Sequence, residues 1–377
     1  MTRYFLASAL SAIGFFALLW AWAFFVPMAY LDPEYPYWRA KLDLMGQCDL
    51  GEVVILGDSR AAADIVPVLL PVKATNLAVG GGKPIEALAA LRRVLACPTP
   101  PKRVVLSFDA GHFMKPDLFW ERSVRFGFVG PADLEALIAV SSDLDDWSVW
   151  NANRADGLPP SWRAALHAAR FPTVVFGNLL QGVVFMRWWG NTDRLAEGLR
   201  SLGHYPFGTA SGSDGIGLEA GLDRYRPSPV LDRYFHDILR LLAERGIAAD
   251  FIAMPMNEAT RARVKPALHE GFTAWLNAIA ARDSNFQVVG TAMPSWPNRY
   301  FGDAFSHLNG EGAIALSHWL SDCLTNRFDG RPCTEPSPHP RLQAAPPKTQ
   351  NDAQYEWFKA TGRDASDSVP PSSKRRS

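Results

Sequence analysis

The stretch VVILGDSRAAADIVPVLL at residues 53–70 decides how this chain folds. Its apolar, largely β-branched start favours a strand, and the alanine-rich run that follows favours the beginning of a helix. Between them lies the turn Gly57-Asp58-Ser59-Arg60. The segment therefore predicts a strand–turn–helix unit that presents Ser59 at the carboxyl end of the strand.

A second unit of this kind and then a third strand follow within a short distance. They are KATNLAVGGG at 73–82, a short strand entering a glycine-rich turn, PIEALAALRRVLA at 84–96, a helix with proline near its start, and VVLSF at 104–108, a third strand. Strands that alternate with helices form a parallel sheet, whose ligand site lies beyond the carboxyl ends of the strands. We expect Ser59, Gly80–Gly82 and Asp109 at that edge.

The same pattern returns in the last third of the chain, with two helix–strand pairs at 229–256 and 268–290. The stretch from about 110 to 228 is rich in Trp, Gly and Pro and is interpreted as a long insertion over the strand ends. One α/β domain over residues 45–333, with a three-layer parallel-sheet architecture, is the simplest organisation. Residues 334–377 are polar and proline-rich, which predicts a disordered tail.

The amino-terminal residues 4–29, YFLASALSAIGFFALLWAWAFFVPMA, contain no charge and are long enough to cross the hydrocarbon core of a bilayer as a helix. A cleavable signal peptide has a shorter apolar core, so an uncleaved transmembrane anchor is favoured. Arg3 lies on one side of it, and Arg39 and Lys41 lie on the other, so loop charge does not decide its orientation. A second apolar stretch at 171–190 is interrupted by polar residues and is expected to be buried or to lie at a membrane surface rather than to span the membrane.

Four cysteines suggest two pairs. Cys48 and Cys97 each precede a strand candidate, so they are expected at the same edge of adjacent parallel strands, while Cys323 and Cys333 flank a short polar segment that a disulfide can close. Four unrelated thiols are the alternative, and the spacing fits no zinc site. Two disulfides indicate an oxidising compartment, which places the body outside the cytoplasm.

Overall charge excludes one class of partner. Lys plus Arg and Asp plus Glu are equal, at 38 each, and no basic stretch interleaved with aromatic residues indicates a nucleic-acid surface. No glycine-rich phosphate loop with lysine and no set of metal ligands is apparent, so no cofactor or metal is expected.

The downstream sequence FGDAFSHLNGEGAIALSHWL supplies the partners that a nucleophilic serine needs. Asp303 and His307 lie just before a helix expected to start near Gly310. A serine hydroxyl is a weak nucleophile at neutral pH unless an imidazole accepts its proton and a carboxylate orients the imidazole. Ser59, His307 and Asp303 are therefore the candidate catalytic residues, although Asp and Ser are also ordinary helix caps.

At this point the chain resembles the SGNH (GDSL-like) hydrolase superfamily, which has a flavodoxin-like α/β fold. Its first block matches Gly57-Asp58-Ser59, and its last block, with Asp and His before the final helix, matches Asp303, His307 and the HLNxxGA run. NLAVGG at 76–81 is similar to the second block, which implies that the N–H of Gly81, with Gly80 next, contributes to an oxyanion hole.

The chain departs from that superfamily in two places. The usual final spacing is Asp-x-x-His, whereas three residues separate Asp303 from His307. The third block normally ends in an asparagine that donates to the oxyanion, and here Asp109 takes that place. An ionised Asp cannot donate a hydrogen bond, which weakens the case for hydrolysis.

A subset of the superfamily, the membrane-anchored SGNH-like proteins that work with membrane-bound O-acyltransferases on bacterial polysaccharides, resembles this chain in its single amino-terminal span. The resemblance implies a serine-dependent transfer of an acyl group, expected to be acetyl, to or from a carbohydrate polymer, at the periplasmic face of a bacterial inner membrane. Two alternatives stay open. They are a carbohydrate esterase with the same fold and a non-catalytic scaffold or glycan-binding subunit.

Three other features have both a functional and a structural interpretation. His112 is a candidate base or substrate contact, but a structural role is favoured. Arg60 either binds an anionic substrate group or lies solvated in the first helical turn. Trp188 and Trp189 either stack on sugar rings or pack in the core or at a membrane interface.

Overall fold

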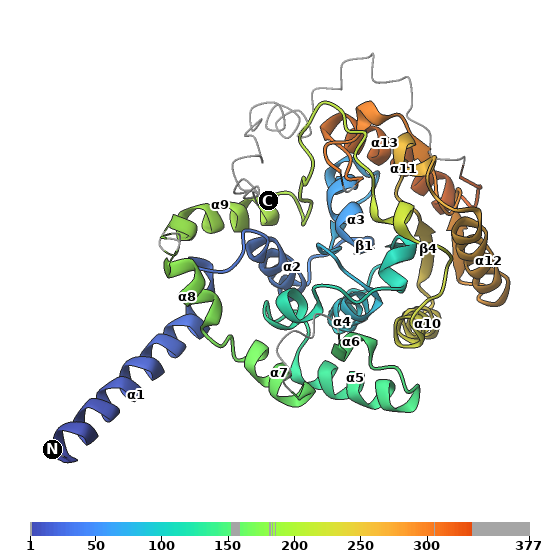
Figure 1. Ribbon diagram of the computed structural model, residues 1–377. Helices are drawn as coiled ribbons and strands as arrows, with labels where there is room; N and C mark the ends of the chain where they lie inside the picture. Colours follow the sequence, from blue (N-terminus) through green and yellow to red (C-terminus); the bar gives the residue numbers. More distant parts are fainter. Residues whose placement is uncertain are drawn as a thin grey trace, which may run out of the picture.

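A computed structural model describes residues 2–151, 159–180, 182, 184, 186–304 and 306–333. The expected tail at 334–377 lies outside the described residues. The chain forms an α/β body around a parallel sheet, from which one long amino-terminal helix projects (Figure 1). This confirms the α/β class and the parallel sheet predicted from the strand–turn–helix units.

The main sheet has five parallel strands in the order β2-β1-β3-β4-β6. They are β1 (Val53–Gly57), β2 (Ala74–Asn76), β3 (Arg103–Ser107), β4 (Ala248–Ile252) and β6 (Phe286–Val289). Counted within this sheet, the order is 2-1-3-4-5, which is a doubly wound topology whose direction reverses between β1 and β3. Ligands bind outside the carboxyl ends at such a reversal, which is where Ser59 and Asp109 follow their strands.

Alternation of side chains along β1 separates two hydrophobic clusters. Val54 and Leu56 belong to the cluster that includes α4 (Pro84–Leu95), α10 (Pro229–Glu244) and α12 (Pro266–Arg282). Val53 and Ile55 belong to the other, with α3 (Ser59–Asp64) and α13 (Gly310–Phe328). Because neighbouring residues of a strand point to opposite faces, this sheet is buried on both sides by helices.

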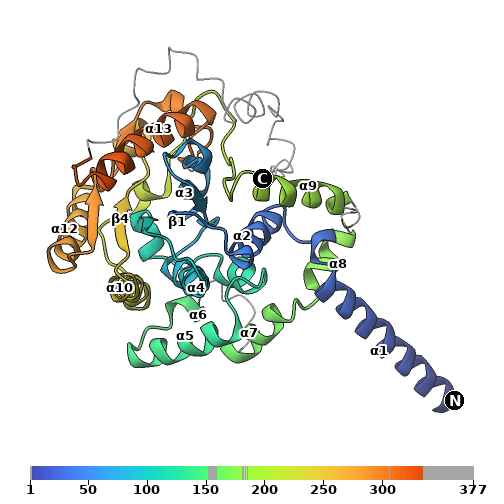
Figure 2. The ribbon, with the colours of Figure 1, turned by 180° about the vertical axis from the view of Figure 1, so that it is seen from behind.

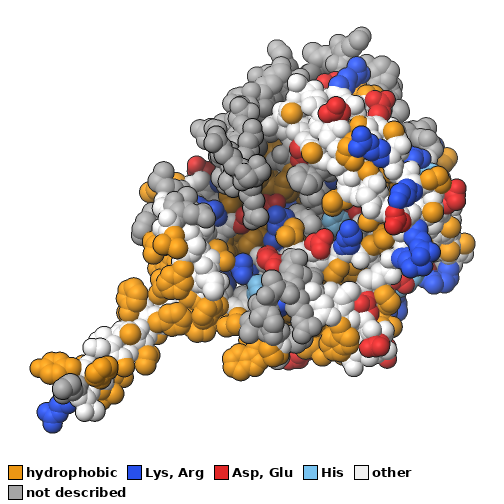
Figure 3. Space-filling model, in the orientation of Figure 1, with side chains coloured by type: hydrophobic (Ala, Val, Ile, Leu, Met, Phe, Trp, Pro, Cys, Tyr) orange, Lys and Arg blue, Asp and Glu red, His pale blue; other side chains and the backbone are white. Residues whose placement is uncertain are grey.

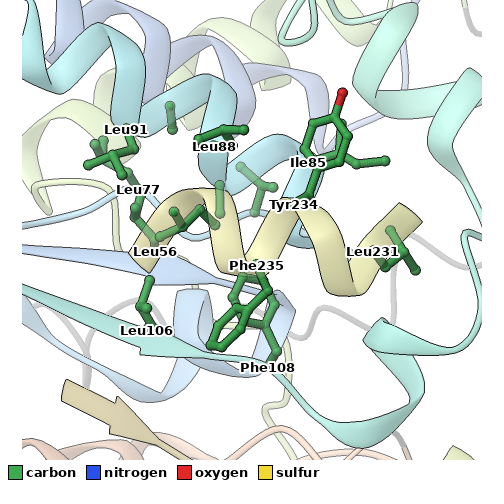
Figure 4. Close-up of a cluster of buried hydrophobic side chains, with 14 of the residues drawn as sticks. Leu56, Leu77, Ile85, Leu88, Leu91, Leu106, Phe108, Leu231, Tyr234 and Phe235 are labelled. Atoms are coloured by element: carbon green, nitrogen blue, oxygen red, sulfur yellow. The ribbon is translucent and has the colours of Figure 1, made fainter. Parts of the chain in front are cut away.

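Figure 4 shows the first of these clusters, where α10 lies across the sheet. Phe235 of α10 packs with Phe108 just beyond β3, at a ring-centroid distance of 6.4 Å. Leu56, Leu106 and Leu88 complete this part of the core and are fully buried or nearly so. Large apolar side chains at three- and four-residue spacing on α10 made the helix predictable, and this packing is what they bury.

The region between Asp109 and α10 contains most of the irregular structure. Its elements are η3 (Ala110–Phe113), η4 (Phe119–Val124), α5 (Pro131–Asp143), α6 (Ser148–Asn151), α7 (Pro160–Ala168), α8 (Thr173–Leu180), α9 (Met186–Arg200) and η5 (Leu218–Gly221). The stretches DLEALIAVSS at 133–142 and SWRAALHAAR at 161–170, whose composition favours helices, lie mostly in α5 and α7. The apolar stretch at 171–190 is divided between α8 and α9, and each is too short to cross a bilayer on its own.

The remaining elements are the helix α2 and several short segments. They are η1 (Pro27–Ala29), α2 (Tyr35–Gln47), η2 (Pro67–Leu69), β5 (Met256–Asn257), α11 (Glu258–Arg261), β7 (Ser295–Trp296) and η6 (Asn298–Tyr300). Strands β5 and β7 form a small parallel sheet of their own. The strand expected at 249–256 therefore ends at Ile252, and Met256 alone of its remaining residues belongs to a strand, β5 of the second sheet.

Two disulfides join Cys48 to Cys97 and Cys323 to Cys333, which confirms both pairs predicted from spacing. The first ties the end of α2 to the residues after α4. The second attaches the carboxyl-terminal end of the described chain to α13. Both are consistent with an oxidising compartment.

Helix α1 (Thr2–Phe25) is the one helix among the described residues that is long and apolar enough to cross a membrane. It projects from the body beside α8 in opposite views (Figures 1 and 2). Its first two-thirds are exposed, and Ala23 near its end is buried. The protein itself does not cover the apolar surface of this helix, which a lipid bilayer could cover.

Candidate functional site

Ser59 is the first residue of α3 and follows β1 directly. Asp58 is the N-cap, and its Oδ1 accepts hydrogen bonds from the backbone N–H of Arg60 at 2.9 Å and of Ala61 at 3.3 Å. Its Oδ2 accepts from the N–H of Asp109 at 3.0 Å, which ties the ends of β1 and β3 together. The capping role thus belongs to Asp58, and the side chain of Ser59 is left for other contacts.

Gly57 is required where the strand turns into the helix. A Cβ atom on Gly57 would lie 2.1 Å from the carbonyl oxygen of Ser107 in β3. Any larger residue would push β1 and β3 apart at the point where the topology reverses. The glycine of the GDS motif therefore permits the close approach that brings Ser59 and Asp109 to one edge.

Ser59, His307 and Asp303 form a continuous hydrogen-bonded chain. The Nε2 atom of His307 lies 2.8 Å from Ser59 Oγ, and its Nδ1 lies 2.6 Å from Asp303 Oδ2. With the Nδ1 proton donated to the carboxylate, Nε2 can accept the serine proton. Such an arrangement can activate the hydroxyl for attack on an acyl carbon. The structure thus brings together all three predicted residues.

The extra residue between Asp303 and His307 does not separate their side chains. Ser306 adopts a left-handed backbone conformation with φ of 63°, and the N–H of His307 also donates to Asp303 Oδ1 at 3.2 Å. The loop is closed by Gly302 N–H, which donates to the carbonyl of His307 at 2.9 Å. A tight turn therefore accommodates the longer spacing.

The His307 ring is held by residues on both sides of its loop. Phe207 stacks on it with a centroid separation of 4.7 Å and an interplanar angle of 20°. The next residue, Leu308, donates its N–H to Asp64 Oδ1 of α3 at 2.9 Å. Because α3 also carries Ser59, this bond fixes the imidazole relative to the nucleophile. Burial raises the pKa of Asp64 well above its usual range.

The glycines after β2 provide backbone N–H groups beside Ser59. Among the described residues, no acceptor faces the N–H of Ser59, Gly80 or Gly81. The carbonyl of Gly80 accepts from Arg122 Nη1 at 3.4 Å, and the carbonyl of Gly81 accepts from Lys83 Nζ at 2.6 Å. Since N–H and C=O point in opposite directions in a trans peptide, Arg122 orients the N–H of Gly81. These amides suit the predicted oxyanion hole.

Arg60, next to the nucleophile, is buried in a group of charges that we name the charge network: Arg60, Asp58, Asp109, His112 and Glu219. The Arg60 guanidinium lies 2.6 Å from Asp109 Oδ2 and also pairs with Glu219. His112 Nδ1 lies 2.8 Å from Asp109 Oδ2 and 3.2 Å from Asp58 Oδ2. The expectation of a solvated Arg60 is therefore wrong, because the side chain is only 4 % exposed.

The charge network favours the ionised forms of His112 and Asp109. Burial disfavours the imidazolium of His112, but the Asp109 and Asp58 carboxylates outweigh burial and raise its pKa. Burial likewise opposes ionisation of Asp109, yet His112 and Arg60 hold the pKa of its carboxyl far below the usual range. Asp109 is thus an acceptor only, and it cannot replace the asparagine donor expected after the third strand.

Asp58, Asp109 and His112 also bring three potential metal-ligand atoms within 4.8 Å of one another. Carboxylate and imidazole groups of this kind do bind cations. Here Asp109 Oδ2 is already paired with Arg60, and Asp58 Oδ2 accepts the Asp109 N–H. The positive charge that a metal would supply comes from the protein's own Arg60 and His112.

A narrow recess near the candidate catalytic residues is lined by Gly80, Phe207, Tyr205 and Ala62. Lys41 of α2 also lines it and donates to the carbonyl of Gly203 at 2.9 Å, while burial lowers the pKa of Lys41 to about 7.

Sequence reasoning missed Phe207 and Glu219. Both belong to the region between Asp109 and α10, where no periodic pattern indicated which residues turn inward. Sequence reasoning did identify His112, and its contacts with Asp58 and Asp109 fit the structural role that was favoured. No family model, curated protein or solved structure matches this chain, so the geometry of the site carries the functional reasoning.

Proposed function

We propose that this protein is a membrane-anchored acyltransferase of the SGNH type, which transfers an acetyl group to or from a cell-surface or exported polysaccharide through an acyl-Ser59 intermediate. The observation that carries the proposal is the hydrogen-bonded chain from Ser59 Oγ through His307 to Asp303. The choice of acetyl as the acyl group rests on the resemblance to the SGNH-like proteins that work with membrane-bound O-acyltransferases.

In the first half-reaction, Ser59 Oγ attacks the acyl carbonyl while His307 Nε2 accepts the hydroxyl proton. The N–H groups of Ser59, Gly80 and Gly81 stabilise the oxyanion of the tetrahedral intermediate. The leaving oxygen takes the proton from His307, and an acetyl ester remains on Ser59. In the second half-reaction, a sugar hydroxyl gives its proton to His307, attacks the ester and releases Ser59 with its proton restored.

The proposed location is the inner membrane of a bacterium, with α1 crossing the bilayer once and the body in the periplasm. The two disulfides support an oxidising compartment. A membrane-bound O-acyltransferase is the proposed partner that supplies the acyl group. The carbohydrate polymer is the proposed acceptor, and its hydroxyl would replace water at the acyl-enzyme.

The test uses the full chain in lipid nanodiscs with para-nitrophenyl acetate as donor and soluble oligosaccharides as acceptors. We expect release of nitrophenol and acetylated sugar, with both lost in Ser59→Ala and both kept in Ser295→Ala, which changes an exposed serine. Ser59-dependent release of acetate without acetylated sugar would instead assign a carbohydrate esterase. Equal behaviour of Ser59→Ala and the unmodified protein would leave the non-catalytic scaffold.

A further inference from the structure

The turn between α7 and α8 touches α1 well before the end of that helix. Trp20 donates its Nε1–H to the carbonyl of Ala169 at 2.9 Å, and the ring of Phe171 lies 5.1 Å from that of Trp20 and 5.9 Å from that of Phe16. These contacts join α1 to a segment about 150 residues away in the chain. They place the α7–α8 turn beside the side of α1, at the level of Phe16 and Trp20, and not beyond the carboxyl end of that helix.

The depth of this turn follows from the length of α1. About 20 residues cross the roughly 30 Å hydrocarbon core. Counted from Tyr4, the first residue after Arg3, they end near Ala23. With a rise of about 1.5 Å per residue, Trp20 then lies about 4.5 Å inside the hydrocarbon boundary and Phe16 about 10 Å inside. Any later starting point for the span would place the turn deeper.

The backbone of the turn is built for an apolar environment, in which each polar group needs an internal partner. The N–H groups of Ala169, Arg170 and Phe171 donate to carbonyls of α7 at 2.9–3.0 Å. The carbonyl of Ala169 accepts from Trp20. Arg170 directs its guanidinium along α1 to the carbonyl of Phe24 at 2.8 Å, so the charge reaches the end of the span, as snorkelling arginines do.

Apolar side chains extend this region onto the neighbouring helices. We define the apolar patch as the exposed large hydrophobic residues of α7, α8 and α9: Trp162, Phe176, Leu179, Leu180, Trp188 and Trp189. Leu180 is 89 % exposed and Trp189 is 75 % exposed. Figure 3 shows hydrophobic side chains continuing from α1 over this part of the body. Three tryptophans in the patch are typical of a membrane interface.

We infer that the α7–α8 turn and the apolar patch are inserted into the outer part of the lipid bilayer, so that the body is held against the membrane at a second site besides α1. The occupant of the patch is lipid, because the patch is continuous with the helix that enters the bilayer. This inference rests on the membrane anchoring proposed above. It would keep the Ser59 site at a fixed position relative to a donor in the same membrane.

Single introduced cysteines test this in the full chain, because all four native cysteines are paired in disulfides. Leu180→Cys reports the patch, Ile13→Cys reports the anchor, and Ala278→Cys on exposed α12 is the control on the side of the body away from α1. Each carries an environment-sensitive fluorophore in nanodiscs of phosphatidylcholine with or without bromine on the acyl chains. Trp189→Cys provides a second patch position.

We expect bromine to quench the labels at 13, 180 and 189 and to leave the label at 278 unchanged. Quenching at 13, with the labels at 180 and 189 as unaffected as that at 278, overturns the inference while preserving the anchor. That outcome would also indicate that the patch needs a protein partner. An unquenched label at 13 overturns both the anchor and the inference. The readout does not depend on catalysis, so loss of the proposed acyltransferase activity would not affect it.

Discussion

Ser59 and Arg60 are adjacent in the chain, yet they belong to two polar groups with opposite properties. Ser59 faces His307 and Asp303, whose side chains are 8 % and 24 % exposed, in a chain of hydrogen bonds that can pass a proton. Arg60 faces the charge network, where both it and Glu219 are 4 % exposed. In the proposed mechanism, Ser59 gives up and regains a proton, whereas Arg60, its neighbour in the first turn of α3, stays charged between two carboxylates.

The largest effect is expected from removing the proton acceptor. His307→Gln should lower acetyl-ester turnover by about 10³-fold or more, because within the described part of the chain the imidazole of His307 is the base in contact with Ser59 Oγ. The free energy of unfolding should change by less than about 1–2 kcal/mol. Turnover and denaturant unfolding of the same preparation check this. The control is His318→Gln, an exposed residue of α13, and equal activity in both variants would refute a catalytic His307.

Removing a member of the charge network should mainly lower stability, whereas removing His307 should mainly lower turnover. Arg60→Met leaves Asp109 and Glu219 buried without their shared cation, and we expect the free energy of unfolding to fall by about 3–5 kcal/mol. Urea unfolding of Arg60→Met measures this. Arg39→Met is the matched control, since Arg39 pairs with Asp43 at 2.9 Å but is 51 % exposed, and its loss should cost less than about 1 kcal/mol. Similar losses in the two variants would remove the distinction between the groups.

A smaller effect is expected from Asp303→Asn. The amide can no longer orient the imidazole as a carboxylate does, and we expect turnover to fall by about 10²-fold, with little change in stability. Steady-state kinetics with the acetyl ester provide the measurement. The nearby exposed Asp214→Asn should retain full turnover. If Asp303→Asn is equally active, the longer Asp–His spacing does not support a catalytic carboxylate.

The smallest effect concerns pH and the charge network. The folded-state pKa of His112 is raised by Asp109 and Asp58, so its charged form stabilises the fold. That contribution is complete below the unfolded pKa of about 6.5 and is lost as the pH rises through the raised folded value. The difference in unfolding free energy between the unmodified protein and His112→Gln should therefore be larger at low pH than in alkaline buffer. A difference independent of pH would mean that His112 is neutral in the network.

Local patterns were enough to predict much of this protein. The strand–turn–helix unit around Ser59, the helices α4, α10 and α12, and the exposed apolar helix α1 each have a periodicity or composition that short-range physics dictates. The two disulfides followed from cysteines placed beside predicted strands and around a short loop. Ser59, His307 and Asp303 could be predicted to lie together because their residue types and their places in the strand and loop pattern have a known chemical use.

Tertiary structure alone decided what surrounds them. His307 is 248 residues from Ser59 in the chain. The hydrogen bond from Leu308 N–H to Asp64 Oδ1 that aligns them could not be predicted from the sequence. Glu219 pairs with Arg60, and Phe171 packs against Trp20. Both contacts depend on the path of segments between Asp109 and α10 that have no periodic sequence pattern. Contacts between distant residues depend on how loops are routed over the sheet, and no local propensity encodes that route.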